Sequence, residues 1–159
     1  MKTIIVVSAR GETGKTSSIV GLSKSFPIEG KKYYYQDGWH DQPEFPDDDK
    51  RDVLCYGEYG DKRVGFSSEG DYVRYVVKCI ERLVGEEVEI MIVASRLHKT
   101  FKNKITECAR RHGYEVIWTS HYHWCGKPED DSRPMMANGT DLNGLFAEHF
   151  TDIIKQMLR

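Results

Sequence analysis

A run of β-branched residues near the start of the chain constrains the fold more than any other feature of the sequence. Residues Thr3 to Ser8 form this run, β-branched at every position except Ser8, which is typical of a strand buried on both faces, as in a parallel sheet. A glycine-containing loop follows at once. The residues from Gly14 to Phe26 then carry an apolar stripe at helical spacing, which ends at Pro27 and Gly30. The sequence therefore predicts a buried strand that leads through a short loop into a helix.

The rest of the chain alternates between predicted strands and predicted helices. We expect a second strand over 32–36 and a polar loop over 39–52, followed by a β-hairpin that joins 53–56 to 63–66. The later elements are helix 71–83, strand 88–94, helix 101–112, strand 114–118 and helix 142–158. This order predicts a single α/β domain over residues 1–159, a three-layer sandwich around a mostly parallel central sheet with one β-hairpin insertion.

The composition of the chain limits the kinds of partner that we expect this protein to bind. The 159 residues carry a net charge of -2, without the basic excess of a typical nucleic-acid-binding domain, so a nucleic acid is not indicated. The apolar runs are far shorter than the roughly 18–20 residues that span a bilayer, so we expect no membrane partner. The four cysteines are widely spaced, as is typical of reduced thiols. We therefore expect a cytoplasmic protein.

The loop from Ala9 to Thr16 has the chemistry of a phosphate-binding loop. Glycines at positions 11 and 14 allow backbone torsions that a Cβ resists. The backbone N–H groups from Glu12 to Thr16 can form a nest for an anion at the start of the helix. Lys15 can reach the β- and γ-phosphates, and the Thr16 hydroxyl can bind Mg²⁺. The loop and its strand–loop–helix context together predict a nucleotide-binding site.

On these residues the chain resembles the P-loop (Walker A) nucleoside triphosphatase and kinase superfamily, and small uncharacterised bacterial members of it. The usual first glycine of the motif is Ala9 here, while Gly14, Lys15 and Thr16 match it. A guanine-specific Asn/Thr-Lys-x-Asp motif is absent, which favours adenine. The resemblance implies ATP and Mg²⁺ as cofactors, Lys15 as a catalytic residue, and a nucleotide-binding set of Gly11, Glu12, Thr13, Gly14, Lys15, Thr16 and Ser17.

The acid that P-loop proteins place near Mg²⁺ has no plain counterpart in this sequence. The strand over 88–94 ends in Ser95 and Arg96 rather than in an aspartate. Glu69 and Asp71 follow the second strand of the hairpin, and if this strand lies beside the first one, its carboxyl end opens on the phosphate site. Both acids are therefore candidate Mg²⁺ ligands beside Thr16. Capping of the next helix is an equally good role for Asp71.

Two further residues are candidates for catalysis. Small-molecule kinases of the P-loop class use an acid after the second strand to hold the acceptor hydroxyl, and the resemblance gives this role to Asp37. The sequence Asp37-Gly38 is also typical of a turn, which is the preferred interpretation. Arg96 follows a predicted central strand and can neutralise charge on a transferred phosphoryl group, with Arg10 and Arg133 as rivals.

One more cluster lies between the last strand and the last helix. His121, His123 and Cys125 alternate and carry atoms that bind zinc, but a fourth ligand is not apparent, so a structural loop is the preferred interpretation. Tyr122 or Trp124 could stack on a nucleotide base.

Three functions compete at this point. The first is Mg²⁺-dependent phosphoryl transfer from ATP to a small-molecule acceptor. The second is a P-loop ATPase that acts as a switch or accessory module, and the third is a regulatory protein that binds a nucleotide without turnover.

Overall fold

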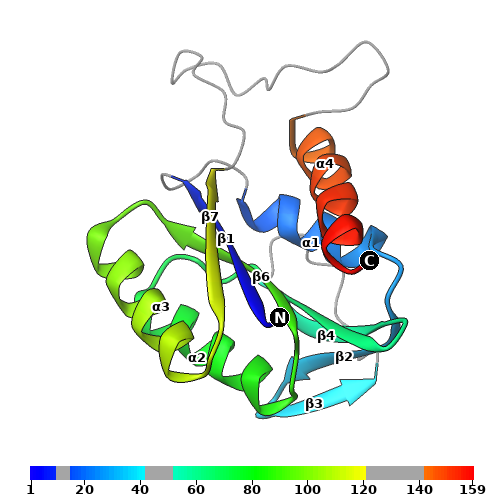
Figure 1. Ribbon diagram of the computed structural model, residues 1–159, viewed down its shortest axis with the longest axis horizontal. Helices are drawn as coiled ribbons and strands as arrows, with labels where there is room; N and C mark the ends of the chain where they lie inside the picture. The colour runs from blue at the N-terminus through cyan, green and yellow to red at the C-terminus, as the bar shows by residue number, and fades with distance from the viewer. Residues whose placement is uncertain (10–14, 42–51, 121–141) are drawn as a thin grey trace.

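The computed structural model describes residues 1–9, 15–41, 52–120 and 142–159, which form one sheet with helices on both faces (Figure 1). The strands are β1 (Thr3–Ala9), β2 (Glu29–Tyr35), β3 (Gly38–Asp41), β4 (Leu54–Tyr59), β5 (Lys62–Ser67), β6 (Ile90–Arg96) and β7 (Glu115–Ser120). The helices are α1 (Lys15–Ser25), α2 (Val73–Gly85), α3 (Lys99–Arg111) and α4 (Leu142–Met157). Within these ranges, no helix is both long and apolar enough to cross a membrane.

The sheet is mixed, with the strand order β3-β2-β4-β5-β6-β1-β7. The strands β5, β6, β1 and β7 are parallel, whereas the pairings β2–β3, β2–β4 and β4–β5 are antiparallel. The chain has the predicted α/β class, but the prediction of a mostly parallel, P-loop-like sheet with one hairpin insertion is wrong. The physical reason is that tight hairpins join β2 to β3 and β4 to β5, and a two-residue turn returns the chain antiparallel to itself.

The β2–β3 hairpin lies where the sequence predicts the end of a strand and the start of a polar loop. Tyr35 pairs with Gly38, so Gln36 and Asp37 form a two-residue turn. Both turn residues have positive φ, 47° and 59°, as a type I′ turn requires. Residues 39–41 of the predicted loop therefore belong to strand β3, and Asp37 is a turn residue.

The β4–β5 hairpin confirms the prediction over 53–66. Tyr59 pairs with Lys62 across a turn in which Gly60 has a φ of +63°, a conformation that costs glycine little. Because β4 is antiparallel to both β2 and β5, the carboxyl ends of β2 and β5 lie at the same edge of the sheet as those of β6 and β1.

Strand β1 is buried on both faces, as its sequence predicts. Ile4 and Val6 belong to the core beneath α2 and α3, whereas Ile5 and Val7 pack on the other face with α1 and α4. The neighbouring strands β6 and β7 pair with β1 on its two sides. β1 is therefore an interior strand with helices on both sides (Figure 1).

Candidate functional site

At the carboxyl end of β1, the connections that follow two adjacent strands run to opposite faces of the sheet. The helix that follows β1, α1, packs on one face of the sheet, while α3, which follows the adjacent strand β6, packs on the other. Connections that diverge in this way leave a crevice beyond the strand ends, and ligands of open α/β sheets bind in such crevices. The predicted phosphate loop joins β1 to α1 at this place.

The structure describes the two ends of the predicted phosphate loop. β1 ends at Ala9 and α1 begins at Lys15, so the strand–loop–helix context that the motif needs is present. Residues Gly11, Glu12, Thr13 and Gly14 lie outside the described residues. Lys15, Thr16 and Ser17 open α1, with only their backbone described. The N-terminus of α1, with its partial positive charge, therefore lies beyond the end of an interior strand.

Two separately predicted residues, Asp71 and Arg96, form an ion pair at this edge of the sheet. Arg96 ends β6, and its Nε and Nη2 atoms donate to Oδ1 of Asp71 at 3.3 Å and 3.2 Å. Both side chains are about half exposed. Asp71 does not cap α2, because the N-cap position belongs to Tyr72, whose side chain makes no capping bond. The pair thus joins a predicted Mg²⁺ ligand to a predicted catalytic arginine.

A close backbone approach at Gly70 brings this pair together. A Cβ on Gly70 would lie 3.0 Å from the Cβ of Ala94 and 3.2 Å from the backbone nitrogen of Ser95. The segment after β5 therefore lies directly against the end of β6, one residue from Asp71 on one side and two residues from Arg96 on the other. Sequence spacing does not reveal this contact between Gly70 and the end of β6.

Glu69 belongs to a carboxyl pair that the sequence did not reveal. Its Oε1 accepts a hydrogen bond from the Asp71 backbone N–H at 3.1 Å. Burial, followed by a hydrogen bond with the Asp52 carboxyl group, raises the pKa of Glu69 from 4.5 to about 7. Ser68 fixes Asp52, because its Oγ donates to Oδ1 of Asp52 at 2.9 Å and accepts from the Val53 N–H at 2.7 Å. Glu69 is thus a carboxyl group that can take or give a proton near neutral pH.

A pocket of about 340 Å³ connects Glu69 with Asp37. It lies at the carboxyl ends of β2 and β5, and three tyrosines, three acids and one arginine contribute to its walls: Tyr34, Tyr35, Tyr75, Asp37, Asp52, Glu69 and Arg82. The Arg82 guanidinium carbon lies 3.9 Å from the centre of the Tyr34 ring. β2 is four strand positions from β1, about 19 Å along the sheet. Asp37 is therefore remote from the phosphate loop, and Glu69 is the nearer acid.

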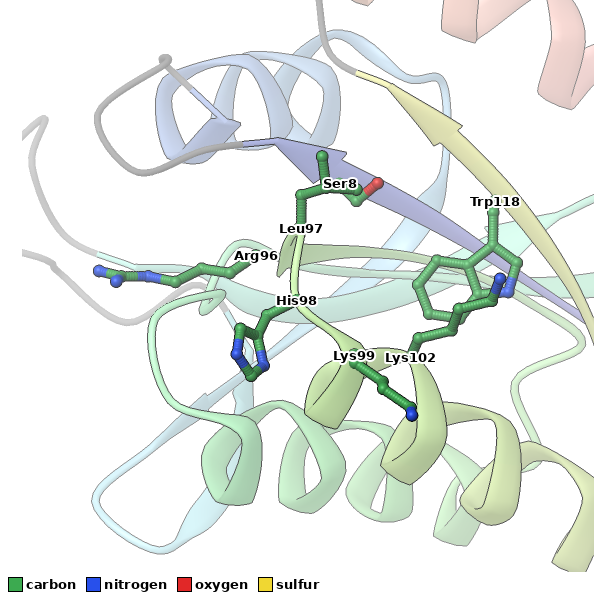
Figure 2. Close-up of a pocket in the computed structure, with 7 residues that line it drawn as sticks. All are labelled: Ser8, Arg96, Leu97, His98, Lys99, Lys102 and Trp118. Atoms are coloured by element: carbon green, nitrogen blue, oxygen red, sulfur yellow. The ribbon is translucent and has the colours of Figure 1, made fainter.

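A second pocket, of about 170 Å³, lies at the carboxyl ends of β1, β6 and β7 on the α3 side (Figure 2). His98 precedes α3, and Lys99 is the first residue of this helix. The His98 Nδ1 atom accepts a hydrogen bond from the Thr100 N–H at 3.2 Å. This pocket was not predicted from the sequence. Its walls are Ser8, Arg96, Leu97, His98, Lys99, Lys102 and Trp118, a basic set with one large aromatic ring.

Comparison of the chain with protein-family models, with curated proteins and with solved structures finds no match. The fold and the site define an α/β domain with a mixed sheet, a helix N-terminus beyond its interior strand β1, and two pockets along the same edge. The cluster of His121, His123 and Cys125 lies outside the described residues, as do Tyr122, Trp124, Arg10 and Arg133.

Proposed function

We propose that this protein binds a nucleoside triphosphate, preferentially ATP, together with Mg²⁺, and transfers the γ-phosphoryl group to a small-molecule acceptor. The observation that carries the proposal is the position of the Ala9–Lys15 connection. It links the carboxyl end of an interior strand to a helix N-terminus at a point where neighbouring connections diverge. The glycine, lysine and threonine residues of the connection supply the chemistry for phosphate and Mg²⁺.

The ligands available for Mg²⁺ are oxygen atoms, which this ion prefers. The Thr16 hydroxyl is the ligand that the motif supplies, and Asp71 adds a carboxylate from the segment after β5. Asp71 uses Oδ1 for Arg96, so Oδ2 is the oxygen we assign to the ion or to its bound water. Bound Mg²⁺ would neutralise phosphate charge. Arg96, held by Asp71, would add positive charge beside the transferred group.

In this proposal Glu69 serves the acceptor rather than the metal. A half-buried carboxyl group with a pKa near 7 is suited to accept a proton at neutral pH. The acceptor oxygen forms a bond to the γ-phosphorus while the bond from that phosphorus to the bridging oxygen breaks. The hydroxyl proton moves to Glu69, and the electron pair leaves on the nucleoside diphosphate. The pocket that Glu69 shares with Asp37 would hold the rest of the acceptor.

The first experiment tests nucleotide binding. Titration calorimetry with Mg²⁺ and a non-hydrolysable ATP analogue should show binding to the wild-type protein and a loss of most affinity in Lys15→Ala. Lys78→Ala is the matched control, because Lys78 is an exposed lysine on α2. Equal affinity in the wild type and Lys15→Ala would overturn the proposal.

The second experiment separates the three competing functions. Release of nucleoside diphosphate is followed with Mg²⁺ and ATP, first alone and then with pools of hydroxyl-bearing and amine-bearing metabolites. Turnover that requires a pool supports transfer to an acceptor. Turnover without any pool indicates an ATPase switch, and binding without turnover indicates a regulatory protein; either result would overturn the transferase proposal.

We place this function in the cytoplasm as part of the proposal. Cys55, Cys79 and Cys108 are free thiols, as is usual in a reducing compartment.

A further inference from the structure

Three side chains that can bind a metal converge where α2 meets α3. The ligand atoms of Glu81, Cys108 and His112 all lie within 4.8 Å of one another. Cys108 lies in the second half of α3, and His112 is the C-cap residue of this helix. The cluster therefore lies at the C-terminal end of α3, whereas the N-terminal end lies at the carboxyl edge of the sheet. The site is therefore separate from the proposed nucleotide site.

The geometry of α3 explains why two of these side chains meet. Cys108 and His112 are four residues apart, which places them one above the other on the same helix face. The His112 backbone N–H donates to the Cys108 carbonyl oxygen at 3.2 Å, so the last turn is closed at this point. Glu81 comes from α2, and its position beside α3 is fixed by an ion pair with Arg111 at 3.5 Å.

Burial changes steeply across the cluster. Cys108 is fully buried in the core between the sheet and the two helices, His112 is half-buried, and Glu81 is exposed. An ion at this position would thus have protein ligands on its inner side and open solvent beyond Glu81. Three protein ligands with a water molecule in the fourth position is a common arrangement for zinc.

We propose that Glu81, Cys108 and His112 form a zinc site that links α2 to α3. The donor set selects the ion, because thiolate and imidazole favour Zn²⁺ over Mg²⁺ or Ca²⁺. Tetrahedral zinc needs ligand atoms about 3.5 Å apart, given bond lengths of about 2.0–2.3 Å. Side-chain rotations that bring the ligand atoms closer by about 1 Å complete the site.

Zinc binding would replace existing interactions between the cluster and its charged neighbours. Arg111 contacts Glu81 and also Glu107, at 4.0 Å, so it keeps an acidic partner when Glu81 turns to the ion. Burial, followed by the charge of Glu81, raises the pKa of the Cys108 thiol. Zinc binding therefore releases the thiol proton, as is general for cysteine ligands.

Cobalt substitution tests the proposal, because Co²⁺ bound to a thiolate gives a charge-transfer band in the near ultraviolet. The wild-type protein should show this band, and Zn²⁺ should abolish it. Cys108→Ser should lack the band. His112→Gln and Glu81→Gln should bind Co²⁺ at least ~100-fold more weakly, since loss of even an outer-shell partner costs 10–100-fold.

Two matched controls locate the ion. Cys55→Ser removes a buried thiol on the other side of the sheet, and Cys125→Ser removes the thiol of the His121–Cys125 cluster. Both should retain the band. Loss of the band in Cys125→Ser, its retention in Cys108→Ser, or its absence from the wild type would overturn the proposal.

Thermal unfolding gives a second readout that does not depend on the thiolate band. A ligand that binds only the folded state raises the unfolding temperature, so Zn²⁺ should stabilise the wild type and Cys125→Ser but not His112→Gln. His112→Gln changes a half-buried side chain at a helix end, so we expect it to fold without metal. Equal stabilisation of His112→Gln by Zn²⁺ would contradict the site.

Discussion

The Arg96 guanidinium donates two hydrogen bonds to a single oxygen of Asp71, from Nε and Nη2, and so connects the end of β6 to the segment that follows β5. Both side chains are about half exposed, and such ion pairs add little to stability. The pair therefore has its main effect on position. It holds a guanidinium and a carboxylate at fixed places on the edge of the sheet where the predicted phosphate loop lies.

Asp71→Asn should show whether the ion pair positions Arg96 for turnover or stabilises the folded protein. We expect the free energy of unfolding to change by less than about 0.5 kcal/mol, while the proposed ATP turnover falls about 10²-fold because Arg96 and Mg²⁺ lose a shared partner. Steady-state kinetics and denaturant unfolding measure the two effects. Asp41→Asn is the control, since it breaks another exposed ion pair, with Lys32, on β2 and β3. Equal turnover in the two variants would exclude a role for Asp71.

Glu69 should make the protein less stable as the pH rises. Its pKa is raised from 4.5 to about 7 by folding, so the folded state holds a proton that the unfolded state has released between these values. Stability from this group is complete below about pH 4.5 and is lost as the pH rises through about 7. Urea unfolding at pH 5 and pH 8 should show a smaller difference for Glu69→Gln than for the wild type. Glu115→Gln, on the exposed side of β7, serves as the control. An unchanged difference in Glu69→Gln would contradict the assignment.

Gly70→Ala should disturb the edge of the sheet. The added Cβ meets Ala94 and the backbone of Ser95 at 3.0–3.2 Å, and this backbone cannot move aside easily. We expect a loss of about 1–3 kcal/mol in unfolding free energy, typical of overpacking, and a weaker Asp71–Arg96 pair. Gly85→Ala, where nothing lies within 4 Å of the new Cβ, should be neutral or slightly stabilising. If the two variants unfold alike, the close approach at Gly70 is not a constraint.

The turn between β2 and β3 should respond to substitution of Gln36. A positive φ of 47° is unfavourable for most side chains but is tolerated by asparagine. Gln36→Asn should therefore stabilise the protein by about 0.5 kcal/mol, and Gln36→Val should destabilise it by about 1–2 kcal/mol. Thermal unfolding of both variants tests this pair of expectations. A valine variant as stable as the asparagine variant would mean that the hairpin does not constrain φ.

The sequence allowed the separate elements to be predicted better than their arrangement. The run from Thr3 to Ser8 indicated a doubly buried strand because every position is apolar or small, and β1 has that environment. The mixed parallel and antiparallel arrangement of the sheet was not predicted, because it depends on the β2–β3 turn. The pair Asp37-Gly38 indicated a turn, but Gln36 is not a residue that indicates positive φ, and the residues after the turn were interpreted as a polar loop rather than as a returning strand.

The candidate site was predicted residue by residue but not as an arrangement. Glu69, Asp71 and Arg96 were selected because they follow strands, and the structure brings them to one edge of the sheet. Their actual partners depend on distances that sequence spacing does not encode. Asp52 reaches Glu69 through the pairing of β4 with β5, and Asp71 reaches Arg96 through the contact of Gly70 with β6.

The first turn of α3 has an electrostatic consequence of its own. It holds no acidic residue, and Lys99 and Lys102 lie where the helix already carries partial positive charge. Charges of the same sign make the start of this helix intrinsically unfavourable, and His98 offsets only part of this by accepting the Thr100 N–H. Any anion that enters the pocket of Figure 2 would relieve this repulsion. In the folded protein, like charges therefore repel each other at this helix end, and an anion bound there would make the helix itself more stable.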